Sequence, residues 1–159
     1  MNESKLNFLK NEFIPLLKKL QPDAKGKWGV LNGQQMVEHF SDAVRIANGS
    51  FGISQILTPA EHLEKIRSFL MSEKPFKENT KNALMSETPL PVRHSAMDAA
   101  IDELQHVFSH FFSMFEGNPG LTTMNPFFGH LNFEENIQLL HKHAMHHLTQ
   151  FGLAETLTV

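Results

Sequence analysis

A chain of 159 residues has the length of one domain, and with 41% hydrophobic and 19% charged residues it lies outside the disordered class. The formal net charge of −3 provides no basic surface for nucleic acid or an anionic membrane. Cysteine is absent, which excludes disulfides, thiolate metal sites and a cysteine nucleophile.

The N-terminal segment is charged and amphipathic, and no stretch reaches the roughly 18 apolar residues that a membrane span needs. We therefore expect a single domain over residues 1–159 and a cytoplasmic location. The chain has ten histidines, and 14 phenylalanines with no tyrosine. An aromatic core of this kind offers few hydroxyl groups, so a reactive site would depend on histidine and a bound ion.

Hydrophobic residues at helical spacing predict a first helix over residues 4–20, which Pro15 should kink or break. A second helix should begin after Asn32, which can form a capping box with Gln35, and should end at Asn48-Gly49.

A short helix should follow from Thr58, which precedes a proline and a glutamate in a capping pattern, and should fade before Lys74-Pro75. Residues 75–94 are polar and contain further prolines, so they predict a long connection.

A third long helix should start near Ser95, with Asp98 three residues on, and end near Glu116-Gly117. The fourth should be capped by Asn132 with Glu135 and run to Phe151-Gly152. No strand pattern of useful length is present. The expected fold is all-α: a four-helix bundle with a long crossover connection between the second and third long helices.

The fourth helix carries four histidines within seven residues, and its apolar stripe decides which of them face inward. His143 and His147 lie one turn apart at the edge of that stripe, so their imidazoles can converge on one ion. His141 flanks the opposite edge, and His146 should point to solvent.

The same spacing occurs on the third helix, in His106 and His110, which lie opposite the phenylalanine stripe and should be solvated. The spacing alone is therefore weak evidence, and a third inward histidine is needed. His39 on the second helix supplies it, with the small Ala43 one turn on leaving room above the ring. The remaining histidines are expected to be structural or at the surface, although one of them, His130, could approach the pocket: His62, His94 and His130.

Three neutral imidazoles from facing helices, His39, His143 and His147, suit a divalent ion with open coordination positions. Zinc, nickel, iron and copper all accept such ligands, so the ion stays open. Gln150, one turn after His147, could contact a ligand or the incoming substrate. The candidates for orienting the rings through their other nitrogens are Gln35, Asn136 and Gln138. Glu38 points about 100° away from His39 and is not expected to act as a base.

The chain resembles the DinB-like (YfiT-like) superfamily of metal-binding four-helix bundles over essentially its whole length. The resemblance rests on Trp28, on the M-V-E-H segment that ends at His39, on N-P-F-F-G-H-L from Asn125 to Leu131, and on H-A-M-H-H-L-T-Q from His143 to Gln150. It implies the same three metal ligands. Many relatives have histidine where this chain has Asn125, which weakens inference of a substrate from them.

Characterised relatives include thiol transferases, thiol-dependent isomerases and proteins labelled as hydrolases. The resemblance implies an enzyme whose ion activates an external low-molecular-weight thiol or water for attack on a small electrophilic substrate. The alternatives are a metal-binding or stress-associated bundle without turnover, and a structural bundle that binds metal only during purification. An apolar group at Phe111, Phe112 and Phe115 could pair two chains as a homodimer.

Overall fold

The computed structural model describes residues 2–78 and 88–155, and this part of the chain is mainly helical, as predicted. The helical segments are α1 (Glu3–Asn7), the π-helical turn η1 (Phe8–Glu12), α2 (Phe13–Leu17), α3 (Gly33–Ala47), α4 (Ala60–Met71), α5 (Met97–Gly117) and α6 (Phe133–Gln150). Within the described residues, no helix is both long and apolar enough to cross a membrane. Part of the predicted connection, residues 79–87, lies outside the described residues.

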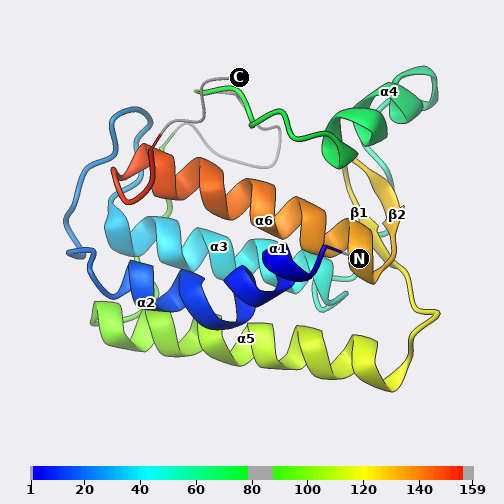
Figure 1. The fold of residues 1–159 in the computed structure, drawn as a ribbon. Helices are drawn as coiled ribbons and strands as arrows, with labels where there is room; N and C mark the ends of the chain where they lie inside the picture. The colour runs from blue at the N-terminus through cyan, green and yellow to red at the C-terminus, as the bar shows by residue number, and fades with distance from the viewer. Residues whose placement is uncertain (1, 79–87, 156–159) are drawn as a thin grey trace.

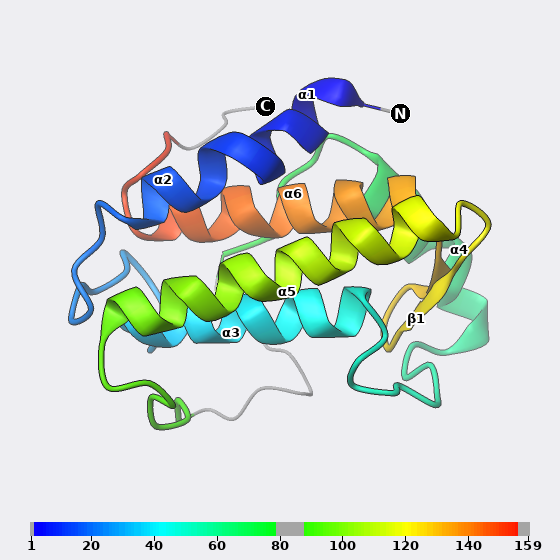
Figure 2. The ribbon, with the colours of Figure 1, turned by 90° about the horizontal axis from the view of Figure 1, so that it is seen from below.

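The long helical segments lie side by side in both views of the ribbon, with α4 set apart at one end (Figures 1 and 2). The N-terminal segment, made of α1, η1 and α2, forms one continuous rod. Helix α3 packs mainly against α5 and also contacts α6. These contacts bring residues from both ends of the sequence into one core.

The N-terminal helix is not interrupted at Pro15, which lies within α2, but it widens into a π-helical turn before that residue. The N–H of Phe13 reaches back five residues to the carbonyl of Phe8. Proline has no N–H to offer the carbonyl four residues before it, so the preceding turn can relax into wider spacing. The helix then ends at Leu17 rather than at the predicted Leu20.

Two of the predicted helix starts are confirmed in detail. Asn32 and Asn132 each accept a hydrogen bond from the backbone N–H three residues on, and Gln35 and Glu135 complete the two capping boxes. The predicted caps of α4 and α5 are wrong. Thr58 donates its hydroxyl to the carbonyl of Phe127 instead, and α5 begins after Ala96 without any side-chain cap.

Phenylalanine rings in contact with one another make up much of the core, as the phenylalanine content indicated. The rings of Phe13 and Phe40, both fully buried, lie 4.8 Å apart between centroids, and Phe108 closes the group from α5 at 6.3 Å from Phe13. Phe111 and Phe115 are buried in this core and Phe112 packs half-buried against it. The proposed dimer surface at these three residues is therefore not an exposed one.

A short hairpin that the sequence did not predict precedes α6. Strand β1 (Thr123–Asn125) pairs antiparallel with β2 (Gly129–Leu131). Asn125 holds the turn, since its side-chain oxygen accepts hydrogen bonds from the backbone N–H groups of Phe127 and Phe128. Strands of three residues are too short to show an alternating pattern, which explains why they were missed.

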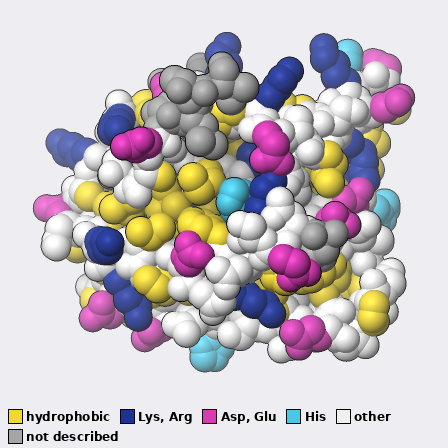
Figure 3. Space-filling view, in the orientation of Figure 1, with side chains coloured by type: hydrophobic (Ala, Val, Ile, Leu, Met, Phe, Trp, Pro, Cys, Tyr) yellow, Lys and Arg dark blue, Asp and Glu magenta, His cyan; other side chains and the backbone are white. Residues whose placement is uncertain are grey.

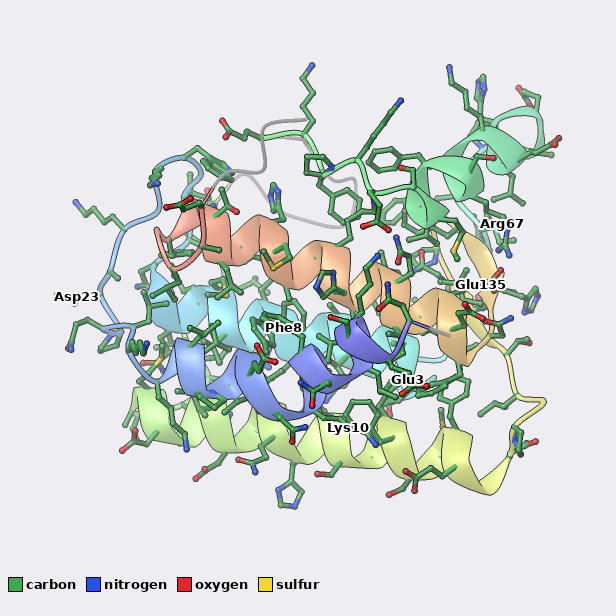
Figure 4. The ribbon with its side chains drawn as sticks, in the orientation of Figure 1. Glu3, Phe8, Lys10, Asp23, Arg67 and Glu135 are labelled. Carbon is green, nitrogen blue, oxygen red and sulfur yellow. The ribbon has the colours of Figure 1, made fainter. Side chains whose placement is uncertain are left out.

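Arg67 joins α4 to the hairpin and to the start of α6. Its guanidinium donates to the backbone carbonyls of Phe128 at 2.7 Å and His130 at 2.9 Å, and to the carboxylate of Glu135 at 2.6 Å. Figure 4 shows Arg67 and Glu135 reaching toward one another across this end of the molecule. A guanidinium group has five N–H donors in a fixed plane, so one arginine can donate to three acceptors at the same time.

Candidate metal centre

Three histidines predicted from the sequence meet at one point between α3 and α6. The Nε2 atom of His143 lies 3.3 Å from that of His39 and 2.8 Å from that of His147. One ring nitrogen from each residue lies within 4.8 Å of those of the other two. The helical spacing explains this geometry, since His143 and His147 are one turn apart on α6 and the middle of α3 brings His39 opposite them.

Phe40, next to His39 on α3, supports the rings from the core side. Its ring centroid lies 4.9 Å from that of His143 and 6.4 Å from that of His147. Because Phe40 is fully buried and also packs on Phe13, the aromatic core extends directly to the histidines. The two imidazoles of α6 are therefore held by packing as well as by the helix that carries them.

Gln150 fixes the proton on His147. Its side-chain nitrogen donates to the backbone carbonyl of Trp28 at 2.9 Å, which turns its oxygen toward Nδ1 of His147 at 2.7 Å. An amide oxygen can only accept, so Nδ1 carries the proton and Nε2 presents a lone pair to the other two rings. The sequence had placed Gln150 near the site as a contact for a ligand or for the incoming substrate, and in the structure it hydrogen-bonds to His147 and orients its ring.

The loop before α3 is shaped around Gln150. A Cβ atom on Gly26 would lie 2.8 Å from Cγ of Gln150, and one on Gly29 would lie 2.7 Å from its Nε2. Gly29 also has a φ of +81°, where other residues are strained. The backbone N–H of Lys27 donates to the carbonyl of Gln150 at 2.7 Å, so the loop holds both the side chain and the backbone at the end of α6.

The proton count at the three nitrogens favours a cation between them. His147 has no proton on Nε2, so its short contact with His143 is a hydrogen bond only if His143 donates from Nε2. In that case Nε2 of His143 carries a proton and has no lone pair with which to accept a hydrogen bond from His39. A divalent ion would take a lone pair from all three rings. At a metal–nitrogen distance of about 2.0–2.1 Å, tetrahedral ligands lie about 3.3 Å apart. The separation of 3.3 Å between His39 and His143 matches this value, and the separation of 2.8 Å between His143 and His147 is shorter.

Burial keeps these imidazoles neutral. It lowers the pKa of His39 to about 4, against an opposing effect of nearby Asp42. It also lowers the pKa of His143 and of His147 well below the ordinary value, and the neighbouring histidines add to the effect. Neutral imidazole is the form that ligates metals, so the three lone pairs are available at neutral pH.

His146 does not point to solvent, as the helical spacing had suggested. Its ring packs half-buried between Trp28, at 5.6 Å between centroids, and Phe76, at 6.1 Å. Phe76 also touches the edge of His143 at 6.4 Å. The chain segment after α4 covers this side of α6, and helical periodicity within α6 could not reveal that cover.

The other residues proposed to orient the rings are used elsewhere. Gln35 completes the cap of α3, and Asn136 donates to Thr123, Leu131 and Asn132. Gln138 donates to the carbonyls of Leu70 and Ser72. These three assignments were wrong: Gln35 is engaged in the cap that the sequence itself predicted, and the segments that Asn136 and Gln138 meet cannot be read from the sequence.

Asn125 does not border the histidines. The hairpin that contains it is joined to the last residue of α3 through the hydroxyl of Thr123, which donates to the carbonyl of Ala47 at 2.8 Å. Ten residues of α6, or about 15 Å, separate the first residue of that helix from His143. The loop that contains Asn125 therefore lies away from the three histidines.

The remaining histidines lie away from the triad. His106 and His110 are exposed on α5, as predicted, and His62 and His130 are exposed as well. His94 is half-buried, with Nε2 2.8 Å from the carboxylate of Glu103.

Beside α3, a charged network ties the segment before α5 to the helix that bears His39. Glu38 is buried and accepts from the side chain of Gln34 and the backbone N–H of Arg93. Arg93 also pairs with Glu103 at 2.5 Å. Burial alone would raise the pKa of Glu103, but hydrogen bonds from Arg93, His94 and Arg45 outweigh it and hold the pKa at about 2. Glu38 is therefore a structural carboxylate, which agrees with its exclusion as a base.

No family model, curated protein or solved structure matches this chain. The fold and the site alone therefore define the class of this protein. It is a mainly helical protein in which two helices far apart in the sequence bring three histidine nitrogens together.

Proposed function

We propose that this chain is a metal-dependent enzyme of the thiol S-transferase or hydrolase type. A divalent ion (zinc, nickel or iron) held by His39, His143 and His147 would activate a low-molecular-weight thiol or water for attack on a small electrophile. The observation that carries the proposal is the convergence of three Nε2 atoms, one of them fixed as a lone-pair donor by Gln150.

We also propose that the fold is a DinB-like (YfiT-like) four-helix bundle. The side-by-side arrangement of the N-terminal rod with α3, α5 and α6 supports this (Figure 2). The crossover would be the connection between α3 and α5, which contains α4. The motifs around His39 and between His143 and Gln150 lie on the two helices where that family carries its ligands.

A divalent ion held by His39, His143 and His147 would lower the pKa of a bound water or thiol toward neutrality and would so supply a nucleophile. The protein's part is to hold three neutral imidazoles in one orientation and to leave further coordination positions open. Gln150 does this for His147, and Phe40 does it for the two rings of α6. Because the chain has no cysteine, a reacting sulfur would have to arrive with a co-substrate.

Metal binding is tested first, by chelating the protein and reloading it separately with zinc, nickel and iron. One ion per chain is expected for the wild type, and loss of that ion is expected in His147→Ala. His110→Ala is the matched control, since it removes an exposed histidine of the same spacing on α5 and should bind like the wild type. Unchanged metal content in His147→Ala would overturn the assignment of the site.

Turnover is tested next, with the reloaded protein, a panel of small thiols and a chromogenic electrophile. A thiol-dependent rate that disappears in His147→Ala and persists in His110→Ala is the expected result. A second candidate is a metal-binding bundle without turnover. The contact of Phe76 with His143 favours this second candidate, because the Phe76 ring restricts the approach of a substrate to the metal ligands. Stoichiometric metal with no turnover of any thiol or ester substrate would support it.

A further inference from the structure

Beside the histidines lies a cavity of about 280 Å³, between the outer face of α6 and the chain segment that follows α4. Its lining combines apolar groups (Trp28, Phe76 and Met145), polar groups (Gln138 and His141) and charged groups of both signs (Lys5, Lys77, Lys142, Glu73 and Glu78). Figure 3 shows a patch of hydrophobic side chains on the face that it presents, with a histidine at the edge of the patch. The cavity therefore offers apolar surface together with charged groups.

Lys142 is an unusual residue for such a position, since its side chain is only 6% exposed. Its ammonium group donates to the backbone carbonyls of Ser72, at 2.8 Å, and Lys74, and lies 4.6 Å from the centre of the Phe69 ring. Among the described residues, no carboxylate lies within ion-pair distance of it. An ammonium has three N–H groups, so one is left for another acceptor.

The neighbouring Lys5 is also buried, but its ammonium group has a counter-charge in contact. Its ammonium contacts the carboxylate of Glu73 at 2.7 Å and the amide oxygen of Gln138 at 2.7 Å. Lys5 therefore has a counter-charge, although Glu73 itself is largely exposed. Among the described residues, no counter-charge is in contact with the ammonium group of Lys142. Burying an unpaired charge costs free energy unless an anion binds beside it.

We propose that this cavity binds the carboxylate of a small organic acid, with the remaining N–H of Lys142 donating to it and the apolar part of the acid lying against Trp28, Phe76 and Met145. Three lysines (Lys5, Lys77 and Lys142) and two glutamates (Glu73 and Glu78) line the cavity, which leaves one formal positive charge in excess. That excess matches the single negative charge of a carboxylate better than the charge of about −1.5 to −2 of a phosphate monoester. At about 30 Å³ for each water-sized group, the volume suits an acid of roughly ten non-hydrogen atoms.

The cavity is separated from the triad by the side chains of Phe76 and His146. Phe76 lines it and touches His143, and His146 lines it and touches His147 at 5.2 Å between ring centroids. An acid anchored at Lys142 would thus lie next to the side chains that flank the metal ligands. The identification of this acid as a substrate rests on the proposed metal-dependent activity, whereas its binding does not.

Trp28 is the single tryptophan of the chain and lines the cavity, so its fluorescence reports on binding directly. Hexanoate is titrated into the full-length protein and compared with hexanamide, which has the same shape without the charge, and with hexylammonium. Hexanoate is expected to bind about tenfold or more tightly than hexanamide, the effect of one charge-assisted hydrogen bond. Equal affinity for the acid and the amide would overturn the proposal.

Lys142→Met keeps the aliphatic stem and removes the charge, and should lower the affinity for hexanoate to that for hexanamide. Lys142→Arg should retain a preference for the acid, and Lys65→Met, on the exposed face of α4, should not change it. Circular dichroism checks that each variant folds. If Lys142→Met does not fold, the comparison of acid with amide in the wild type still decides the proposal.

His39→Ala separates this proposal from the proposed function. His39 does not line the cavity, so the variant should lose the metal and still prefer hexanoate. A wild type that binds hexanoate but no metal would overturn the proposed function and leave the acid site standing. A wild type that binds one metal ion but does not distinguish hexanoate from hexanamide would overturn the acid site and leave the proposed function standing.

Discussion

The side-chain oxygen of Gln150 lies 2.7 Å from Nδ1 of His147, and its side-chain nitrogen lies 2.9 Å from the carbonyl of Trp28. This pair of hydrogen bonds decides which nitrogen of His147 faces the other two imidazoles. A partner of this kind both orients a ligand and raises its basicity.

Gln150→Ala should therefore weaken metal binding by about 10- to 100-fold without removing any ligand. Titration of the chelated protein with zinc against a competing indicator measures the change. Gln105→Ala, an exposed glutamine on α5, is the control and should leave the affinity unchanged. An affinity within twofold of the wild type in Gln150→Ala would show that the hydrogen bond does not support the site.

Gly29→Ala should act on the same site through Gln150. The new Cβ would lie 2.7 Å from Nε2 of Gln150, and a φ of +81° strains any residue with a Cβ by about 1–2 kcal/mol. Gly52→Ala is a matched control, since Gly52 has a φ of +59° but nothing within 4 Å of the added atom. Both variants should lower the free energy of unfolding in urea. Only Gly29→Ala should also weaken zinc binding.

Zinc should stabilise the wild-type protein by mass action, because the three imidazoles converge only in the folded state. At a free zinc concentration 100 times the Kd, the free energy of unfolding should rise by about 2.7 kcal/mol. Thermal unfolding followed by circular dichroism measures the rise as a function of zinc. No dependence of the midpoint on zinc is expected for His147→Ala, and an equal dependence in that variant would contradict the prediction.

Acid should destabilise the protein partly through Glu103. Its pKa of about 2 in the folded state lies below the unfolded value of 4.5, so its contribution is complete above pH 4.5 and is lost as the pH falls toward 2. Glu103→Gln should therefore be less stable than the wild type at pH 7, and the difference should shrink between pH 4.5 and 2. Urea unfolding across that range tests it, with the exposed Glu64→Gln as the control. A difference that stays constant with pH would exclude this role.

The two asparagine caps should be worth more than the threonine and serine that the sequence also suggested as caps. Asn132→Ala removes an observed cap and should lower the free energy of unfolding by about 1 kcal/mol. Ser95→Ala should cost much less, because Ala96 is the residue before α5 and no side chain caps that helix. Urea unfolding compares the two, and an equal loss would contradict the observed difference in capping.

Periodicity within a helix was enough to predict the triad. His39, His143 and His147 were chosen because of their positions beside apolar stripes, and the structure brings them together. The same reasoning failed for His146, since the rings that cover it, Trp28 and Phe76, come from distant segments. A helical pattern shows which side chains face the core, but not which segments cover the opposite face.

Buried cations were also beyond the reach of the sequence. Lys5 and Lys142 would be placed at the surface by any rule based on polarity, yet each is buried, with its ammonium donating to specific oxygens. Their partners are a glutamate and two backbone carbonyls of the segment after α4, and only the folded chain puts that segment beside α6. The sequence thus predicted the three histidines of the site, but not the side chains and the chain segment that pack around them.

The contact between His39 and His143 spans 104 positions of the chain. An ion shared by these two residues would act as a cross-link between distant parts of a protein that has no cysteine with which to form one. In a chain-entropy model, closing a loop of about 100 residues destabilises the unfolded state by about 4.7 kcal/mol. The same ion would then stabilise the folded state, so that loss of the metal would lower the free energy of unfolding as well as any activity.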